Sequence, residues 1–164
     1  MKSIVAIEVA RPRRQVAMLL ANPANMTKWM HDLAGYDLID GDPGAAGARF
    51  HMVPKPGTEQ ADFVSIVTAM HLPERHCLRL ESPEVDVVVD TTFEALAKNR
   101  TRIVSKEKFT FHGLFRRLFG RFARDDIHKH HRDHIEAFKQ FAESVSGAVP
   151  HAAAESHPPW RRVA

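Results

Sequence analysis

The stretch RPRRQVAMLLANPANMTKWMHDL, residues 11–33, decides the first part of the fold, because it follows a strand-like segment and precedes a long series of turn signals. Pro12 suits the first turn of a helix, which we expect to end before Asn22. Asn22 and Pro23 then start another helix, as its N-cap and its first helical residue. Apolar and polar residues alternate over residues 3–9, which predicts a strand there. The sequence thus begins with one strand and two short helices.

Six further strand-like runs follow, separated by turn sequences rich in Pro, Gly, Asp and Asn. Their expected ranges are 36–40, 47–53, 60–70, 75–81, 85–96 and 101–111. The connections are too short for parallel crossovers, which favours antiparallel neighbours. Together with the first strand, these runs predict an α+β domain with a curved antiparallel sheet of seven strands.

A strongly helical pattern returns only near the C-terminus. Apolar residues and two histidines recur there at steps of four and three, as one buried stripe of a long helix: Ile127, His131, His134, Phe138, Phe141 and Val145. The aromatic residues of 115–122 would fall on the opposite side of that helix, so we predict a break near Gly120. The last residues show no periodicity. We therefore expect a single domain over 1–146 and a flexible tail over 147–164.

The composition is that of an ordinary globular domain, with 164 residues, 44% hydrophobic and 26% charged. Cys77 is the single cysteine, which excludes an intrachain disulfide and suits a reducing compartment. The sequence shows neither a signal peptide nor a membrane-spanning run, so we expect a cytoplasmic protein. A net charge of +3 comes from nearly balanced signs, and no nucleic-acid partner is expected.

The order of strand, two short helices, six antiparallel strands and a long C-terminal helix is that of the helix-grip fold. The segment VAMLLANPANMTKWMHDL at 16–33, followed by a Gly-Asp-Pro-Gly turn and GARFHM at 47–52, resembles the START-like polyketide cyclase/dehydrase and lipid-transport superfamily, SRPBCC. The resemblance covers residues 3–145 and implies a deep cavity between the sheet and the long helix. Its members include carriers of lipids and hormones, quinone-binding proteins and aromatase/cyclases. Their active residues differ between subfamilies, so none is transferred to this chain.

Glu107 is the one ionisable residue that breaks the apolar pattern on the inner face of the last strand. His131 and His134 lie on the buried stripe of the long helix, which the fold would place opposite this strand. Because an unpaired buried carboxylate is costly, we expect Glu107 to pair with one of these histidines. Such a pair can be purely structural, can anchor a ligand, or can act as acid and base in a cyclisation or dehydration. We favour a structural or anchoring role over catalysis.

The leading interpretation is a protein that binds a hydrophobic or amphipathic small molecule, such as a lipid, quinone or polyketide, in its cavity. Apolar side chains of the sheet and the helices would form the wall, with a few polar groups to orient the ligand. The expected ligand-binding residues are Trp29, Met30, Phe50, Met52, Val64, Ile66, Leu78, Val89, Phe93, Ser105, Glu107, Phe109, His131, His134 and Phe138.

Four histidines cluster on the predicted long helix, and His130 and His134 have the i, i+4 spacing of a metal-binding pair. Asp126 and Asp133 are near enough in sequence to add ligands or to orient the imidazoles. The chain has neither an HExxH pattern nor a cysteine cluster. We therefore expect solvated and cavity-lining histidines, with no metal and no cofactor.

The segment GLFRRLFGRFAR, residues 113–124, combines arginines with phenylalanines. The favoured interpretation is a lid over the cavity whose arginines reach water. The alternative is a surface that docks on an anionic membrane or on a partner through Arg116, Arg117, Phe119 and Arg121. The sequence indicates no particular oligomeric state.

Overall fold

The computed structural model describes residues 1–58, 61–113 and 123–146. The elements are β1 (Lys2–Val9), α1 (Arg13–Ala21), the short 3₁₀ helix η1 (Pro23–Asn25), α2 (Met26–Trp29), β2 (Leu33–Asp40), β3 (Arg49–Pro54), β4 (Phe63–His71), β5 (Arg75–Glu81), β6 (Val85–Ala97), β7 (Arg100–Phe111) and α4 (Ala123–Ser144). None of the helices in these ranges is both long and apolar enough to cross a membrane. The predicted break near Gly120, the lid or docking segment and the tail lie outside the described residues.

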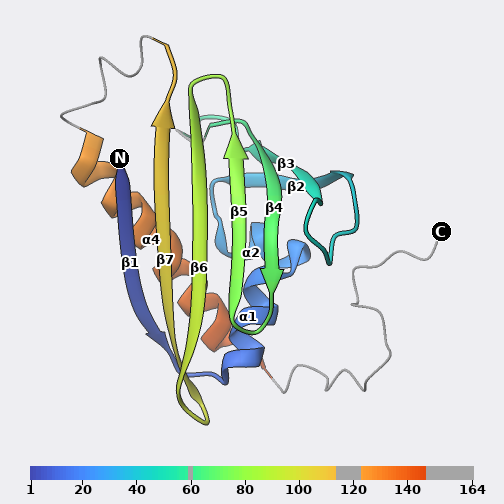
Figure 1. The fold of residues 1–164 in the computed structure, drawn as a ribbon. Helices are drawn as coiled ribbons and strands as arrows, with labels where there is room; N and C mark the ends of the chain where they lie inside the picture. Colours follow the sequence, from blue (N-terminus) through green and yellow to red (C-terminus); the bar gives the residue numbers. More distant parts are fainter. Residues whose placement is uncertain (59–60, 114–122, 147–164) are drawn as a thin grey trace.

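The strands form one seven-stranded sheet in the order β1-β7-β6-β5-β4-β3-β2, and all neighbours are antiparallel (Figure 1). This confirms the predicted fold class. β2 begins at Leu33 and not near Tyr36 as the sequence predicts. Leu33 already pairs with Pro54 of β3, so it belongs to the sheet and not to the preceding helical segment. β1 crosses over to pair with the last strand, β7, and this pairing places Ser3 opposite Glu107. The first and last strands of the chain are therefore adjacent at the edge where the polar site lies.

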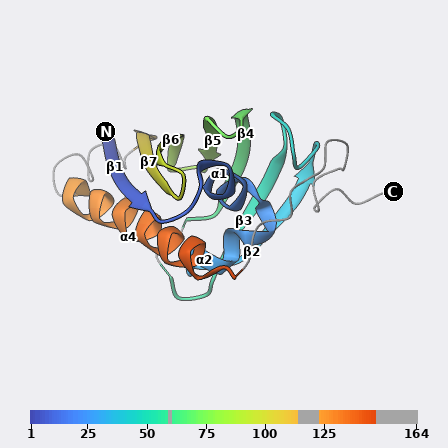
Figure 2. The same cartoon turned by 90° about the horizontal axis from the view of Figure 1, so that it is seen from below.

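The helices all lie on the concave side of the sheet, with α4 crossing it and α1 and α2 beside it (Figure 2). Phe138 and Ala142 of α4 are fully buried against this face. The ring of Phe138 packs edge to face on Trp29 of α2, with centroids 5.4 Å apart. This contact couples the long helix to the short N-terminal helices, so the two together close the concave side.

The junction between α1 and α2 follows the capping chemistry predicted from Asn22 and Pro23. The side-chain oxygen of Asn22 accepts a hydrogen bond from the backbone N–H of Ala24, at 3.0 Å. The buried side chain of Asn25 donates to the carbonyl of Leu19 at 3.1 Å, which ties the new helix back to the end of α1. The Asn22 cap therefore sets the start of η1, which leads directly into α2 and so helps to position Trp29 at the end of α2.

Arg11 fixes the C-terminal end of α4. Its guanidinium donates to the carbonyls of Glu143 and Val145, at 2.8 and 2.7 Å. Carbonyls at a helix C-terminus lack partners within the helix, and a cation there also meets the negative end of the helix dipole. Arg11 lies two residues after the end of β1, so this contact ties the end of the long helix to the first strand of the sheet.

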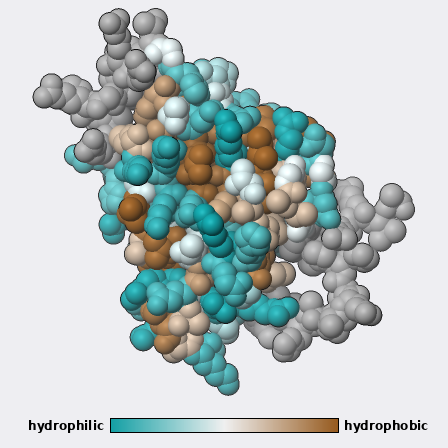
Figure 3. All heavy atoms as spheres, viewed as in Figure 1, coloured by the Kyte–Doolittle hydropathy of each residue, from teal (hydrophilic) through white to brown (hydrophobic). Residues whose placement is uncertain are grey.

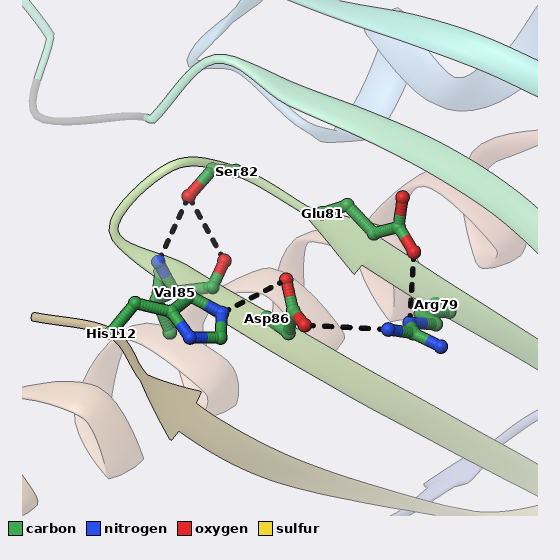
Figure 4. A network of polar contacts seen from close by, with 6 residues as sticks. All are labelled: Arg79, Glu81, Ser82, Val85, Asp86 and His112. Carbon is green, nitrogen blue, oxygen red and sulfur yellow. Dashed lines mark hydrogen bonds and ion pairs between the residues drawn. The ribbon is translucent and has the colours of Figure 1, made fainter.

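The convex face of the sheet mixes hydrophobic patches with hydrophilic side chains (Figure 3). A network of polar side chains lies on this face at the β5–β6 hairpin (Figure 4). In it, the carboxylate of Asp86 lies 3.4 Å from the guanidinium of Arg79 and 3.3 Å from the imidazole of His112. Ser82 closes the turn through bonds to the backbone N–H and carbonyl of Val85. Exposed ion pairs of this kind each contribute little to the stability of the fold. The main effect of the network is therefore to make this part of the convex face hydrophilic.

Candidate functional site

A cavity of about 80 Å³ lies between the concave face of the sheet and the helices. Its wall is mostly apolar and includes a small group of polar side chains from the sheet and from α4. The residues that line it are Leu20, Met26, Trp29, Met30, Tyr36, Met52, Ser65, His76, Leu78, Leu80, Val89, Thr91, Ser105, Glu107, His131, His134 and Ile135. An apolar cavity with a few convergent polar groups is the usual form of a small-molecule site.

Most of the expected binding residues lie on this cavity. They are Trp29, Met30, Met52, Leu78, Val89, Ser105, Glu107, His131 and His134. The inner face of β7 and the buried stripe of α4, which the sequence predicts to carry the polar groups of the site, therefore meet at this cavity.

Val64 and Ile66 are not part of the wall, and the expectation that they face the concave side is wrong. They pair with His51 and Arg49 of β3, on the convex face, whereas Ser65 between them faces the cavity. β4 carries apolar residues on both faces, so its alternation did not distinguish the buried side.

Four expected aromatic residues belong to the core and do not line the cavity. Phe138 and Phe93 are buried in the main core, and Phe109 packs against its edge. Phe50 lies in a separate cluster with Ala48 and Val67, where it stacks on Tyr36 with ring centroids 4.6 Å apart. These side chains support the wall from behind, because they pack against the residues that form it.

His131 is the centre of a buried polar network. Its side chain is 1% exposed, and its two ring nitrogens pair with the hydroxyls of Ser3 at 2.8 Å and Ser105 at 2.9 Å. The hydroxyl of Ser3 also lies 3.0 Å from Nδ1 of His128. Each strand of the β1–β7 pair thus contributes one serine that holds the imidazole in place.

Glu107 projects from β7 beside this network. Its carboxylate lies 3.7 Å from Nδ1 of His131, and burial raises the pKa of the carboxyl group to about 7. Burial also lowers the pKa of His131 to about 4, with added repulsion from neighbouring histidines. Glu107 and His131 therefore lie side by side, as predicted, but at 3.7 Å their contact is longer than a hydrogen bond. Burial, and not an ion pair with His131, raises the pKa of the acid, which is protonated in part of the molecules at neutral pH.

Three buried polar atoms of the cavity wall have no hydrogen-bond partner among the described residues. They are Nε1 of Trp29 and Nε2 of His76 and His134. Burial lowers the pKa of both histidines to about 4, so at neutral pH each ring carries one N–H donor and one acceptor nitrogen. Buried polar groups without partners are rare in native proteins, so these atoms are positions where a ligand or water can bind.

The sequence interpretation missed Tyr36, Ser65 and His76 as parts of the site. The hydroxyl of Tyr36 donates to that of Ser65 at 2.9 Å, and burial raises the pKa of the phenol to about 12. His76 is 4% exposed and projects from β5. The available signal for Ser65 was a polar residue between apolar residues of β4. That pattern points to the cavity only when it is known which face of the strand is buried.

A second polar cluster lies beside the cavity wall, where Asp32 approaches His130 and His134 of α4. One potential ligand atom from each residue lies within 4.8 Å of the other two. Asp126 and Asp133, the carboxylates considered from sequence spacing, are not part of this group. Asp32 comes from the turn between α2 and β2, which no helical spacing could have indicated.

The fold and the sequence both have recognisable relatives. The sequence model of the family described as polyketide cyclase / dehydrase and lipid transport matches residues 2–143. A comparison with curated protein sequences found no significant relative.

Solved structures with the same fold cover most of this chain at low sequence identity. The protein TTHA0849 from Thermus thermophilus has a TM-score of 0.72 at 9% identity, over 87% of this chain and 97% of its own. Ara h 8.0201 has a TM-score of 0.66 at 12% identity, over 88% and 99%. Norcoclaurine synthase from Thalictrum flavum, in complex with dopamine and hydroxybenzaldehyde, has a TM-score of 0.66 at 12% identity, over 90% of both chains. By the match of its sequence over nearly its whole length, the chain belongs to the polyketide cyclase/dehydrase and lipid-transport family.

Proposed function

We propose that this protein binds a hydrophobic or amphipathic small molecule in the cavity between its sheet and helices, as a cytoplasmic carrier or sensor. The observation that supports this most is the set of buried polar atoms without hydrogen-bond partners at Trp29, His76 and His134, all on one mostly apolar wall within the described part of the chain. Apolar burial would supply the affinity, and these atoms with Glu107 would orient the polar part of the ligand.

The size of the cavity bears on the ligand. One water molecule needs roughly 10–15 Å³ in this measure, so about 80 Å³ has room for roughly six groups of that size. That is about the volume of one aromatic ring or a short acyl segment. We therefore propose a ligand that buries one ring or acyl segment and extends its remainder toward the mouth of the cavity.

Native mass spectrometry of the protein purified from its own host tests this proposal. The expected result is a mass above that of the chain, which shifts back after extraction with organic solvent and releases a lipid, quinone or polyketide-like compound. A protein that carries no such molecule and takes up none from a host lipid extract would contradict it.

Glu107 supports a second candidate function, a cyclase or dehydrase. A carboxylate with a pKa of about 7 is a stronger base than an ordinary one and can remove a proton from a carbon next to a ketone. His131, held by two serines, lies 3.7 Å from this carboxylate and would act as a positioning residue beside the base. The description of the family names both enzymes and lipid transport. Membership therefore does not choose between catalysis and binding, and the enzyme candidate rests on the site residues alone.

The variant Glu107→Gln separates binding from catalysis, because it keeps the shape of the side chain and removes the base. If the protein is a cyclase, turnover of a poly-β-ketone substrate falls by about two to four orders of magnitude while substrate binding persists. Wild-type turnover equal to that of the variant, or none in either protein, would remove the catalytic function and leave binding.

A further inference from the structure

Asp32, His130 and His134 bring together the ligand types of a transition-metal site. His130 and His134 lie one turn apart on α4, and their ring centroids are 4.0 Å apart. Asp32 reaches the same place from the turn before β2, and its Oδ2 lies 4.0 Å from Nε2 of His134. All three potential ligand atoms fall within 4.8 Å of one another.

Nε2 of His134 gives this cluster a feature that a chance surface group lacks. The atom is buried and has no hydrogen-bond partner among the described residues, and at 4.0 Å the carboxylate of Asp32 is too far away to provide one. A buried polar atom without a partner is costly, whereas a bound cation would pair with both the nitrogen and the carboxylate.

We propose that Asp32, His130 and His134 bind a divalent transition-metal ion such as Zn²⁺. Two imidazoles and a carboxylate are borderline ligands that suit such ions. With bonds of about 2.1 Å, the ligand atoms of a tetrahedral site lie roughly 3.4 Å apart. The cluster therefore has to contract by about 1 Å, which the exposed ring of His130 and the 41% exposed side chain of Asp32 allow by rotation.

Three protein ligands leave at least one coordination position open, as in zinc sites that bind water or a substrate. His134 lines the cavity, so an ion held there would stand at the cavity wall. An oxygen atom of the bound molecule could then complete the coordination, a step that rests on the proposed function. The metal site itself does not depend on it.

Zinc and cobalt titrations of the metal-stripped, full-length protein test the site. The chain has 11 histidines, so weak background binding is expected and the comparison between variants decides. The ligand variants are D32N, H130N and H134N. The controls are D133N, which removes the neighbouring carboxylate of α4, and H71N, which removes an exposed histidine on β4.

The expected result is one tightly bound Zn²⁺ per chain and, with Co²⁺, a visible absorption band of a four-coordinate nitrogen and oxygen site. Each ligand variant should weaken Zn²⁺ binding by at least about tenfold to hundredfold, and both controls should bind like the wild type. Equal affinity in the wild type and the ligand variants, or a loss in D133N in place of D32N, would overturn the proposal. If H134N fails to fold, D32N and H130N decide, because both positions are at least partly exposed.

The same titrations separate this proposal from the proposed function. Metal binding without any small-molecule ligand would support the site and leave the carrier function to its own experiment. Ligand retention in a protein that binds no Zn²⁺ would reject the site and keep the carrier function.

Discussion

The carboxylate of Glu107 lies 3.7 Å from Nδ1 of His131, with both side chains facing the same cavity from opposite sides. Glu107 comes from β7 of the sheet and His131 comes from the long helix. The hydroxyl of Ser3 on β1 forms a hydrogen bond with Nδ1 of His131, the ring nitrogen that faces Glu107. This contact lies among the polar side chains of a mostly apolar wall. Its chemistry therefore determines how the site responds to pH and to mutation.

Glu107→Gln should remove a pH-dependent loss of stability. The pKa of Glu107 is raised from 4.5 to about 7, so the folded state holds this proton more tightly than the unfolded state. Its contribution to stability is full below pH 4.5 and is lost as the pH rises to about 7. The loss is on the order of 3 kcal/mol.

Urea unfolding of wild type and E107Q at about pH 5 and about pH 8 measures this difference. The wild type should lose stability relative to E107Q across the window, and the comparison isolates Glu107 because the histidines titrate in both proteins. Glu94→Gln, on the convex face of β6, serves as the control and should follow the wild type. If the stability of E107Q and that of the wild type changed in parallel with pH, the pKa of Glu107 would not be raised in the folded state.

Ser105→Ala should destabilise the protein by about 1–3 kcal/mol, because it removes the hydroxyl that pairs with the buried Nε2 of His131. The matched control is Ser144→Ala, whose hydroxyl bonds to a carbonyl in the exposed last turn of α4. The control should change stability by less than about 0.5 kcal/mol. Equal losses in both variants, measured by chemical unfolding, would show that the His131 network contributes nothing specific.

Phe138→Ala should cost about 3–5 kcal/mol of stability, since the side chain is fully buried and packs on Trp29. Trp29 is one of two tryptophans, so in a Trp160→Phe background its fluorescence reports the loss of that contact directly. Phe141→Ala, on the same helix but only partly buried, should cost less. A reversed order of the two losses would mean that α4 packs on the sheet in another rotation.

Arg11→Met should loosen the end of α4, because it removes hydrogen bonds to the carbonyls of Glu143 and Val145. The expected loss is about 2 kcal/mol, as for bonds made by a charged donor. Hydrogen exchange should accelerate first in the last turn of the helix. Arg14→Met, at an exposed position of α1, should leave both quantities unchanged.

Local patterns were sufficient to predict most of the fold. The Asn22 cap, the turn sequences and the stripe on α4 are each short-range signals, and each corresponds to an observed element. Glu107 and His131 were predicted to meet because strand alternation and helical period both placed them inward.

The rest of the site depends on contacts between distant parts of the chain. Ser3 reaches His131 only because β1 pairs with β7 in one particular register. Val64 and Ile66 were placed on the wrong face because β4 is apolar on both faces. Asp32 meets His134 through tertiary packing alone, for which the sequence contains no periodic signal.

The most direct test of the central claim is to fill the cavity and measure binding of the apolar fluorescent dye anilinonaphthalene sulfonate. Val89→Phe places a larger side chain into the cavity, whereas Val88→Phe makes the same change on the convex face of the same strand, at a position that is 44% exposed. Both variants should unfold cooperatively. If the cavity is the binding site, V89F loses dye binding and V88F retains the wild-type affinity. Undiminished binding by a folded V89F protein would contradict the account.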